Sequence, residues 1–318
     1  MGRLKWRKPW FRLALGGLAL SLFFTNCDTP HQFSLTDEAS LQAQGIYSFS
    51  AEFSPNTTSS LPIDLIWVID NSGSMSNEAA HVRANFEAFA STLEQSIDFR
   101  LALISKSGNS GTNVSLPYSG VNYLQVDKTV ASRNPLTLAA QAICPAGSTC
   151  GSISGNGTLT SFLRAESKKV FVIVTDDDAD ITADAFARSF EANYPASQLA
   201  VFGFIGKNKN CSITRLGGVY ETLSSSTGGS TYDICLNDWS STFSSLVNSL
   251  TAISRNWIQM PQTAAPIEKV LQVHVNGVLI PEGSYHFDGS ILTLSPSIVN
   301  GVSGVLRVHV IYQLQMGA

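Results

Sequence analysis

The feature that most constrains the fold is an almost continuously apolar run, Ile63-Asp64-Leu65-Ile66-Trp67-Val68-Ile69. A strand with one face in water alternates apolar and polar residues. A continuous run is instead typical of a strand that is buried on both faces of a parallel sheet. Similar runs follow at Phe99–Ile104, Val170–Val174 and Leu199–Ile205. The sequence therefore predicts a buried, mostly parallel sheet.

Amphipathic helix patterns lie between and after these runs. In the stretch 77–97, apolar residues recur at spacings of three or four, as on one face of a helix. Further patterns occupy 182–193 and 238–257. The alternation of strand and helix predicts an α/β domain with a doubly wound, Rossmann-like sheet over 63–257. The region 105–160 is rich in Gly, Ser and Asn, so we expect long loops there, with a short edge strand near 121–126.

The pattern of apolar and polar residues changes after Pro261. Val273 and Val275 alternate with polar residues, and Asn276-Gly277 then gives a hairpin signal. Asp288-Gly289 marks a second turn, and no helix pattern follows. Residues 266–313 are therefore predicted to form a small all-β module.

The N-terminus predicts export. Five basic residues lie within the first twelve positions, and the apolar run Leu13–Phe24 follows them. This run is about a dozen residues, shorter than the roughly 20 that span a membrane. Cys27 comes shortly afterwards and resembles the lipidated cysteine of a bacterial lipoprotein, although an ordinary signal peptide or an uncleaved anchor stays open. We expect a signal at 1–27, a tether at 28–62 and a lipid anchor in the cell envelope, on the periplasmic or the surface side of a bacterial membrane.

Charge and motifs exclude several classes of protein. Without the five N-terminal basic residues, 15 basic residues face 24 acidic ones, and this balance argues against a nucleic-acid partner. The chain has no G-x-x-x-x-G-K-[ST] loop for a nucleotide, no G-x-S-x-G elbow and no H-E-x-x-H zinc motif. The sequence thus offers no obvious nucleophile or general base of an enzyme.

The remaining cysteines fall into two near pairs, Cys144 with Cys150 and Cys211 with Cys235. An exported protein meets an oxidising compartment, where such pairs form disulfides. A metal site is the alternative, but no C-x-x-C spacing occurs. We therefore predict two disulfides.

An oxygen-rich loop, Asp70-Asn71-Ser72-Gly73-Ser74, directly follows the first apolar run and precedes a helix. A tight turn eased by Gly73 would direct the side chains of Asp70, Ser72 and Ser74 toward one centre. A carboxylate and two hydroxyls are hard oxygen donors, which suit Mg²⁺, Mn²⁺ or Ca²⁺. Ligands of open parallel sheets bind at the carboxyl ends of the strands, where this loop is expected.

A second acidic loop follows the run Val170–Val174. It contains Asp176, Asp177, Asp178 and Asp180, whose mutual repulsion a bound cation would relieve. Either loop taken alone has a plainer interpretation, because Ser74, Ser76 or Asp180 would also serve as a helix N-cap. Two such loops at the ends of buried strands favour a metal site.

The pattern D-x-S-x-S at Asp70, Ser72 and Ser74, with Asp176 as a second aspartate, resembles the metal-ion-dependent adhesion site of the von Willebrand factor A family. The resemblance covers about 63–257. More narrowly, V-I-D-N-S-G-S-M at 68–75 together with the stretch Ser161–Arg164 resembles an exported bacterial group of these domains. It implies a divalent cation, Mg²⁺ before Mn²⁺ or Ca²⁺, whose open coordination position takes an acidic group of the ligand. The family also supplies a threonine from a middle loop, for which Thr137 is our choice and Thr158 the rival. The usual T-D-G is here Thr175-Asp176-Asp177.

These observations lead to one expectation and two alternatives. We expect a membrane-tethered adhesion or scaffolding protein that binds a protein or another acidic ligand through the cation and is not an enzyme. The first alternative is a Mg²⁺-dependent hydrolase that uses Asp177, Asp178 or Asp180. The second is a metal-free assembly module that acts through its β segment.

Overall fold

The structure is a computed structural model that describes residues 40–53, 62–302 and 304–315. The predicted signal at 1–27, the lipidation site Cys27 and the tether residues 28–39 and 54–61 lie outside these ranges. Among the residues described, no helix is both long enough and apolar enough to cross a membrane.

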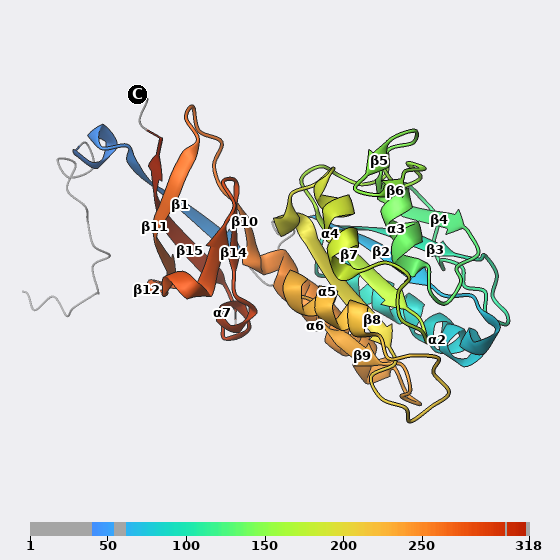
Figure 1. Ribbon diagram of the computed structural model, residues 1–318. Coiled ribbons are helices and arrows are strands. Elements are labelled where there is room, and N and C mark those ends of the chain that lie inside the picture. Colours follow the sequence, from blue (N-terminus) through green and yellow to red (C-terminus); the bar gives the residue numbers. More distant parts are fainter. Residues whose placement is uncertain (1–39, 54–61, 303, 316–318) are drawn as a thin grey trace, which may run out of the picture. The chain divides into compact units, whose positions relative to one another are not determined.

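A six-stranded sheet forms the centre of the α/β domain, with the strand order β4-β3-β2-β7-β8-β9 (Figure 1). Every pair of neighbouring strands is parallel. The strands are β2 (Ile63–Ile69), β3 (Phe99–Ser105), β4 (Tyr123–Asp127), β7 (Lys168–Val174), β8 (Leu199–Ile205) and β9 (Thr231–Asp233). All residues of β2, β7 and β8 are buried, which confirms the interpretation of the apolar runs.

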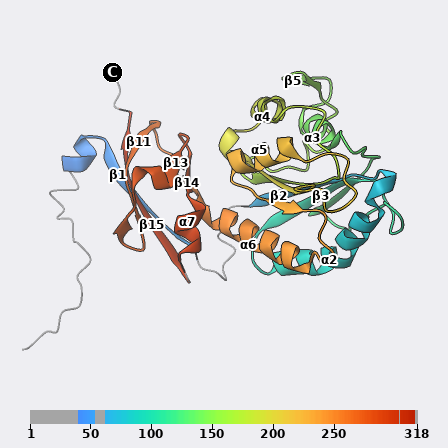
Figure 2. The ribbon, with the colours of Figure 1, turned by 60° about the horizontal axis from the view of Figure 1, so that its bottom comes forward.

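Helices cover both faces of this sheet, as Figure 2 shows. Helices α2 (Ser76–Glu94) and α6 (Ser240–Asn256) pack on one face through the apolar stripes that the sequence predicted. Helices α3 (Pro135–Ile143), α4 (Ala183–Glu191) and α5 (Gly218–Thr227) cover the other face. Trp67 of β2 is fully buried on the first face, where its ring lies 5.1 Å from that of Phe86 and 5.6 Å from that of Phe243. The domain is therefore doubly wound.

The chain reverses its direction of travel across the sheet between β2 and β7. From β2 it moves outward through β3 to β4, and it then returns to the other side of β2 and continues through β7 and β8 to β9. Such a reversal leaves a crevice at the carboxyl ends of the two central strands, which is where open α/β sheets bind ligands. The loops that follow β2 and β7 are the two loops that contain the predicted metal ligands.

The opposite, amino edge of the same sheet is held by a buried ion pair. Asp64 on β2 is fully buried, and it accepts hydrogen bonds from Nε and the backbone N of Arg164, at 2.8 and 2.6 Å. Ser167 donates a further hydrogen bond to this carboxylate at 2.5 Å. Arg164 belongs to the stretch Ser161–Arg164 that suggested an exported bacterial group, and its role here is structural.

The β module contains two antiparallel sheets, with the strand orders β1-β15-β11-β12 and β10-β14-β13. Its strands are β1 (Ile46–Phe53), β10 (Trp257–Gln259), β11 (Ile267–Val275), β12 (Val278–Leu279), β13 (Tyr285–Phe287), β14 (Ile291–Leu294) and β15 (Leu306–Leu314). Asn276 and Gly277 both have positive φ, at 49° and 82°, as the predicted two-residue hairpin turn requires.

The module differs from the prediction in three places. Residues 46–53 were expected in a tether but form β1, which pairs with β15 along its whole length. Trp257 begins β10 of the module rather than ending the preceding helix. A short helix, α7 (Pro296–Asn300), interrupts a region where none was expected. Its five residues are too few to give an amphipathic pattern.

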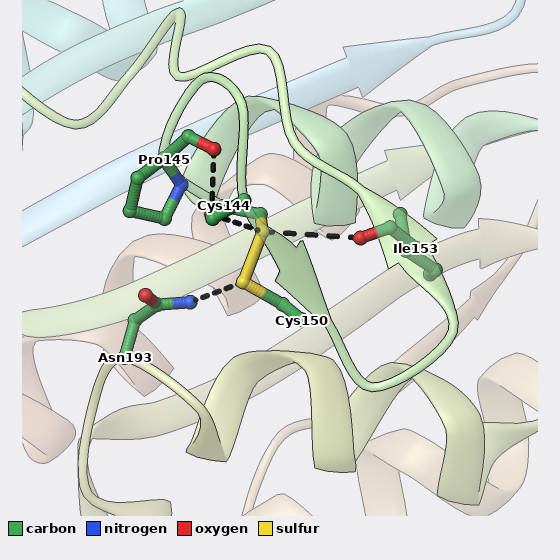
Figure 3. Close-up of a disulfide and its surroundings, with 6 residues drawn as sticks. Cys144, Pro145, Cys150, Ile153 and Asn193 are labelled. Carbon is green, nitrogen blue, oxygen red and sulfur yellow. Dashed lines mark hydrogen bonds between the residues drawn. A yellow bond between two sulfur atoms is a disulfide. The ribbon is translucent and has the colours of Figure 1, made fainter.

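Both predicted disulfides are present. Cys144 and Cys150 join the end of α3 to a small hairpin of β5 (Thr149–Cys150) and β6 (Ile153–Ser154), with Cα atoms 5.9 Å apart (Figure 3). Asn193 donates a hydrogen bond to Sγ of Cys150 at 3.0 Å. Cys211 and Cys235 join the loops that follow β8 and β9, both at the carboxyl edge of the sheet. The second disulfide therefore braces the edge that carries the candidate site.

Candidate metal site

The two oxygen-rich loops leave the sheet side by side. The backbone N of Asp70 donates to the carbonyl of Val174 at 3.0 Å, and the backbone N of Thr175 donates to that of Phe204 at 3.1 Å. These bonds continue the parallel ladder by one residue beyond β2 and β7. They fix where Asp70 and Asp176 begin to depart from the central strands.

The first loop folds around the carboxylate of Asp70. Asp70 is fully buried, and its two oxygens accept from the backbone N of Ser72 at 2.7 Å and from the hydroxyl of Thr175 at 3.1 Å. The hydroxyls of Ser72 and Ser74 lie 3.1 Å apart. The loop thus brings the side chains of Ser72 and Ser74 together beside the buried carboxylate of Asp70.

The helix-cap interpretation of these residues does not apply. No side-chain hydrogen bond caps the 3-10 turn Gly73–Met75 or helix α2, and the N-cap of α4 is Thr182, which accepts from the backbone N of Ala185. The hydroxyls of Ser72 and Ser74 are consequently left for another role. Asp180 is likewise not a cap.

Asn71 fixes the loop to its neighbour. Its amide nitrogen donates to the hydroxyl of Ser105 at 3.0 Å and to the carbonyl of Thr112 at 2.7 Å. Its amide oxygen accepts from the backbone N of Lys106 at 2.7 Å. These contacts join the D-x-S-x-S loop to the loop that follows β3.

Gly73 does not have the role that the sequence suggested. Its φ lies outside the left-handed region, and a Cβ added to it would meet nothing within 4 Å. The turn therefore places no steric demand for glycine at this position. The space around Gly73 is open to solvent instead.

Most carboxylates of the second loop have hydrogen-bond partners within the protein, which the sequence did not indicate. Asp177 accepts from Nε of Arg215 at 2.6 Å, and Asp178 accepts from the backbone N of Val219 at 3.0 Å, in the first turn of α5. Asp180 accepts from the hydroxyl of Thr137 at 2.7 Å. These three carboxylates therefore have hydrogen-bond partners within the protein, which the sequence alone did not reveal.

Asp176 is the exception in this loop. It is only 4% exposed, and its Oδ1 has no hydrogen-bond partner. No ion pair in the described part of the chain includes Asp70 or Asp176. The two buried carboxylates thus follow adjacent strands, and neither forms an ion pair with a basic side chain.

The electrostatics of the site follow from this arrangement. Burial raises the pKa of Asp70, the hydrogen bonds from Ser72 and Thr175 oppose that rise, and the negative charge of Asp176 adds to it. For Asp177, burial alone would raise the pKa, but the hydrogen bonds from Arg215 and the backbone of Asp178 outweigh it and lower the pKa. Asp177 is therefore stabilised as an anion, whereas Asp70 lacks a comparable partner.

Glu78, in the first turn of α2, is a residue that the sequence reasoning missed. Burial raises the pKa of its carboxyl group, and the charges of Asp176 and Asp70 raise it further. Its Oε2 also has no hydrogen-bond partner. Its position eight residues after Asp70, on the helix that follows the loop, was the available signal.

The structure separates the two candidate threonines. Thr137 lies in the first turn of α3, and Asp180, which its hydroxyl contacts, is itself bonded through its backbone N to the carbonyl of Arg133. Thr158 contacts Asn156, which is bonded to Gln141 near the other end of α3. Thr137 is thus at the helix end that faces the acidic loop, although its hydroxyl points to Asp180.

The predicted ligands are all oxygen donors, the type that hard divalent cations prefer. Among the described residues, no group of three or more His, Cys, Asp or Glu side chains is arranged to hold a metal ion. The set predicted here has a different composition, with the carboxylates of Asp70 and Asp176 and the hydroxyls of Ser72, Ser74 and Thr137. The unpartnered Oδ1 of Asp176 and the pair of hydroxyls are oxygen donors of the kind that Mg²⁺ and Ca²⁺ prefer.

Comparison with known proteins adds no family: no family model matches the chain, and no curated protein matches it.

Proposed function

We propose that this chain is a von Willebrand factor A-type protein that binds an acidic ligand through a divalent cation. Asp70, Ser72, Ser74 and Asp176 would hold the ion, and Thr137 would complete the set after releasing Asp180. The observation that carries the proposal is a pair of buried carboxylates, Asp70 and Asp176, that have no basic partner. They lie at the carboxyl ends of β2 and β7, between which the chain reverses its direction across the sheet. Burying charge without a partner costs free energy, so natural proteins keep such pairs mainly where a ligand or reaction uses them.

The bound cation would supply a Lewis-acidic centre for an anionic group. The chain's own contribution is to hold the donors before the ion arrives. Ser72 N and Thr175 Oγ1 orient the Asp70 carboxylate, and Asn71 holds the loop in place. Because the protein would fill only part of the ion's coordination sphere, positions would stay open for a carboxylate of the partner. An acidic protein segment is the ligand class that this arrangement favours.

An exported, membrane-tethered adhesion or scaffolding role is the biological setting that we propose. Its support is the N-terminal signal pattern with Cys27, together with two disulfides, which persist in oxidising compartments. Mg²⁺ is our first choice of cation, with Mn²⁺ and Ca²⁺ next.

Calorimetric titration of the full chain with Mg²⁺, Mn²⁺ and Ca²⁺ tests the proposal. We expect saturable binding of one ion, weakened by at least about 100-fold in Asp70→Ala, since loss of even an indirect partner of a metal costs about 10–100-fold. Asp184→Asn is the matched control, because it removes a carboxylate that is 70% exposed on α4. Circular dichroism should show that both variants fold.

Two results would redirect the assignment. If none of the three ions binds, either alone or with an acidic probe peptide, a metal-free assembly module becomes the better interpretation. Turnover of phosphate esters or glycosides that depends on Asp178 would instead favour a hydrolase. The carboxylate of Asp178 already accepts a hydrogen bond from the backbone N of Val219 at the start of α5. This contact makes it a poor candidate for a general base.

A further inference from the structure

A hollow of about 290 Å³ lies beside the candidate cation site, between the start of α2 and the residues that follow β9. Asn77, Glu78 and His81 form its helical wall, and Ile234, Leu236 and the Cys211–Cys235 disulfide form the wall opposite. Pockets for drug-sized ligands measure roughly 300–1,000 Å³. The hollow is thus of a size to take one long side chain rather than a whole organic ligand.

Both walls are held in place without a ligand. The ring of His81 stacks on that of Trp239, with 5.3 Å between their centroids, and Nε1 of Trp239 donates to the carbonyl of Leu236 at 3.0 Å. The disulfide covalently joins the loop that follows β8 to the loop that follows β9. Binding would therefore cost little conformational entropy of the site, because its walls are already ordered.

Glu78 connects the hollow with the cation site, although it is not one of the predicted metal ligands. Glu78 lines the hollow and lies in the first turn of α2, the helix that begins two residues after Ser74 of the D-x-S-x-S loop. A ligand that places an acidic group on the cation would thus bring its neighbouring residues to the mouth of the hollow.

The chemistry of the lining selects the occupant. Glu78 is the only acidic lining residue, and the lining includes no lysine or arginine. Glu78 takes part in no ion pair in the described part of the chain. The opposite wall is apolar, with Ile234 buried and Leu236 44% exposed. An aliphatic stem with a cationic head matches such a combination of apolar wall and carboxylate.

We propose that this hollow is a subsite for a lysine or arginine side chain of the same polypeptide ligand whose acidic group binds the cation. The inference rests on the proposed function and narrows its ligand class. The partner would present an acidic residue and a basic residue near each other on one exposed segment.

The subsite is tested first without any cation. The probes are N-acetyl-lysine methylamide and its uncharged analogue N-acetyl-norleucine methylamide, titrated into the full chain while NMR follows the Ile234 methyl groups and the His81 ring. The titration is carried out at a single fixed pH. We expect the lysine probe to shift both reporters saturably, and to bind about threefold more tightly than the norleucine probe, as a partly exposed ion pair allows.

Variants locate the effect. Glu78→Gln should remove the preference for lysine over norleucine, and Asn237→Lys should place an ammonium of the protein itself at the hollow and block the probe. Glu87→Gln is the matched control, because Glu87 is exposed on the same helix and does not line the hollow. Equal binding of the two probes, unchanged selectivity in Glu78→Gln, or no shift of either reporter would each overturn the subsite.

A second step tests whether one ligand uses both sites. With saturating Mg²⁺, the peptide N-acetyl-Asp-Gly-Gly-Lys-amide should bind at least about tenfold more tightly than the lysine probe, through the effective concentration that the linker provides. The same peptide with Asn in place of Asp should lose this gain. If the Asp peptide binds no more tightly than the lysine probe, the idea that one ligand uses both sites is refuted. Failure of Mg²⁺ binding with an intact lysine effect would refute the cation proposal alone, so the two failures are distinguishable.

Discussion

Asp64 and Asp70 lie near opposite ends of the same strand, β2, and both are fully buried, yet their surroundings differ. Asp64 receives hydrogen bonds from the Arg164 guanidinium, the Arg164 backbone and Ser167. Asp70 receives only neutral donors, and its charged neighbour Asp176 is also acidic. A carboxylate buried for stability comes with a cationic partner in the protein. The absence of such a partner for Asp70 is what distinguishes a candidate ligand site from a structural one.

The largest expected effect is at the amino edge. Asp64→Asn should lower the free energy of unfolding by about 3 kcal/mol, because it breaks a buried ion pair and leaves Arg164 without its main partner. Denaturant unfolding measures this. Asp98→Asn is the control, since Asp98 contacts the same arginine but is 51% exposed. Equal losses in the two variants would remove the distinction between a buried and an exposed partner.

The carboxyl edge should behave in the opposite way. In metal-free protein, Asp70→Asn should leave the free energy of unfolding unchanged or higher, because it removes one of two buried like charges. Mg²⁺ at 100 times its dissociation constant should stabilise the wild type by about 2.7 kcal/mol and the variant by nothing measurable. A metal-free Asp70→Asn protein that is as destabilised as Asp64→Asn would mean that Asp70 is a structural residue after all.

Local sequence could identify the carboxylates but not their partners. Asp70 and Asp176 were predicted as ligands because each follows an apolar run by one or two residues. Asp177, Asp178 and Asp180 gave the same local signal, and only contacts with Arg215, Val219 and Thr137 distinguish them. Asp64 is 100 residues from Arg164, and no spacing rule links the two. Glu78 was hidden for a related reason, since a first-turn glutamate is an ordinary feature of a helix.

A pH experiment sharpens the description of the amino edge. Lys169 is fully buried near Asp64, and burial lowers its pKa from 10.5 to about 8, against the opposing charge of Asp64. Between these two values the unfolded chain binds more protons than the folded chain, so stability should rise with pH, by at most about 1.4 kcal/mol per pH unit. The measurement is the difference in unfolding free energy between the wild type and Lys169→Met from pH 7 to about 10. A flat difference would show that Lys169 titrates as it does in the unfolded chain.

The smallest effect is expected at Gly73. Because an added Cβ meets nothing within 4 Å and φ is not left-handed, Gly73→Ala should change the free energy of unfolding by no more than about 0.5 kcal/mol. Thermal unfolding without metal checks this. If the same variant weakens binding of an acidic peptide in the presence of Mg²⁺, the open space at Gly73 belongs to the ligand. A large loss of stability would instead restore the steric role that the sequence suggested.

The pairing of β1 with β15 has a consequence for how the chain reaches its native state. Ile46 pairs with Gln313 and Phe53 with Leu306, so the two strands are separated by nearly the whole described chain. Contacts between residues so far apart in the chain form late, because closing the long intervening loop costs entropy that the new contacts must offset. The α/β domain is encoded entirely between these strands and needs neither of them for its sheet. It can therefore fold while β1 is still unpaired, and the sheet that contains β1 becomes complete only once β15 has been synthesised.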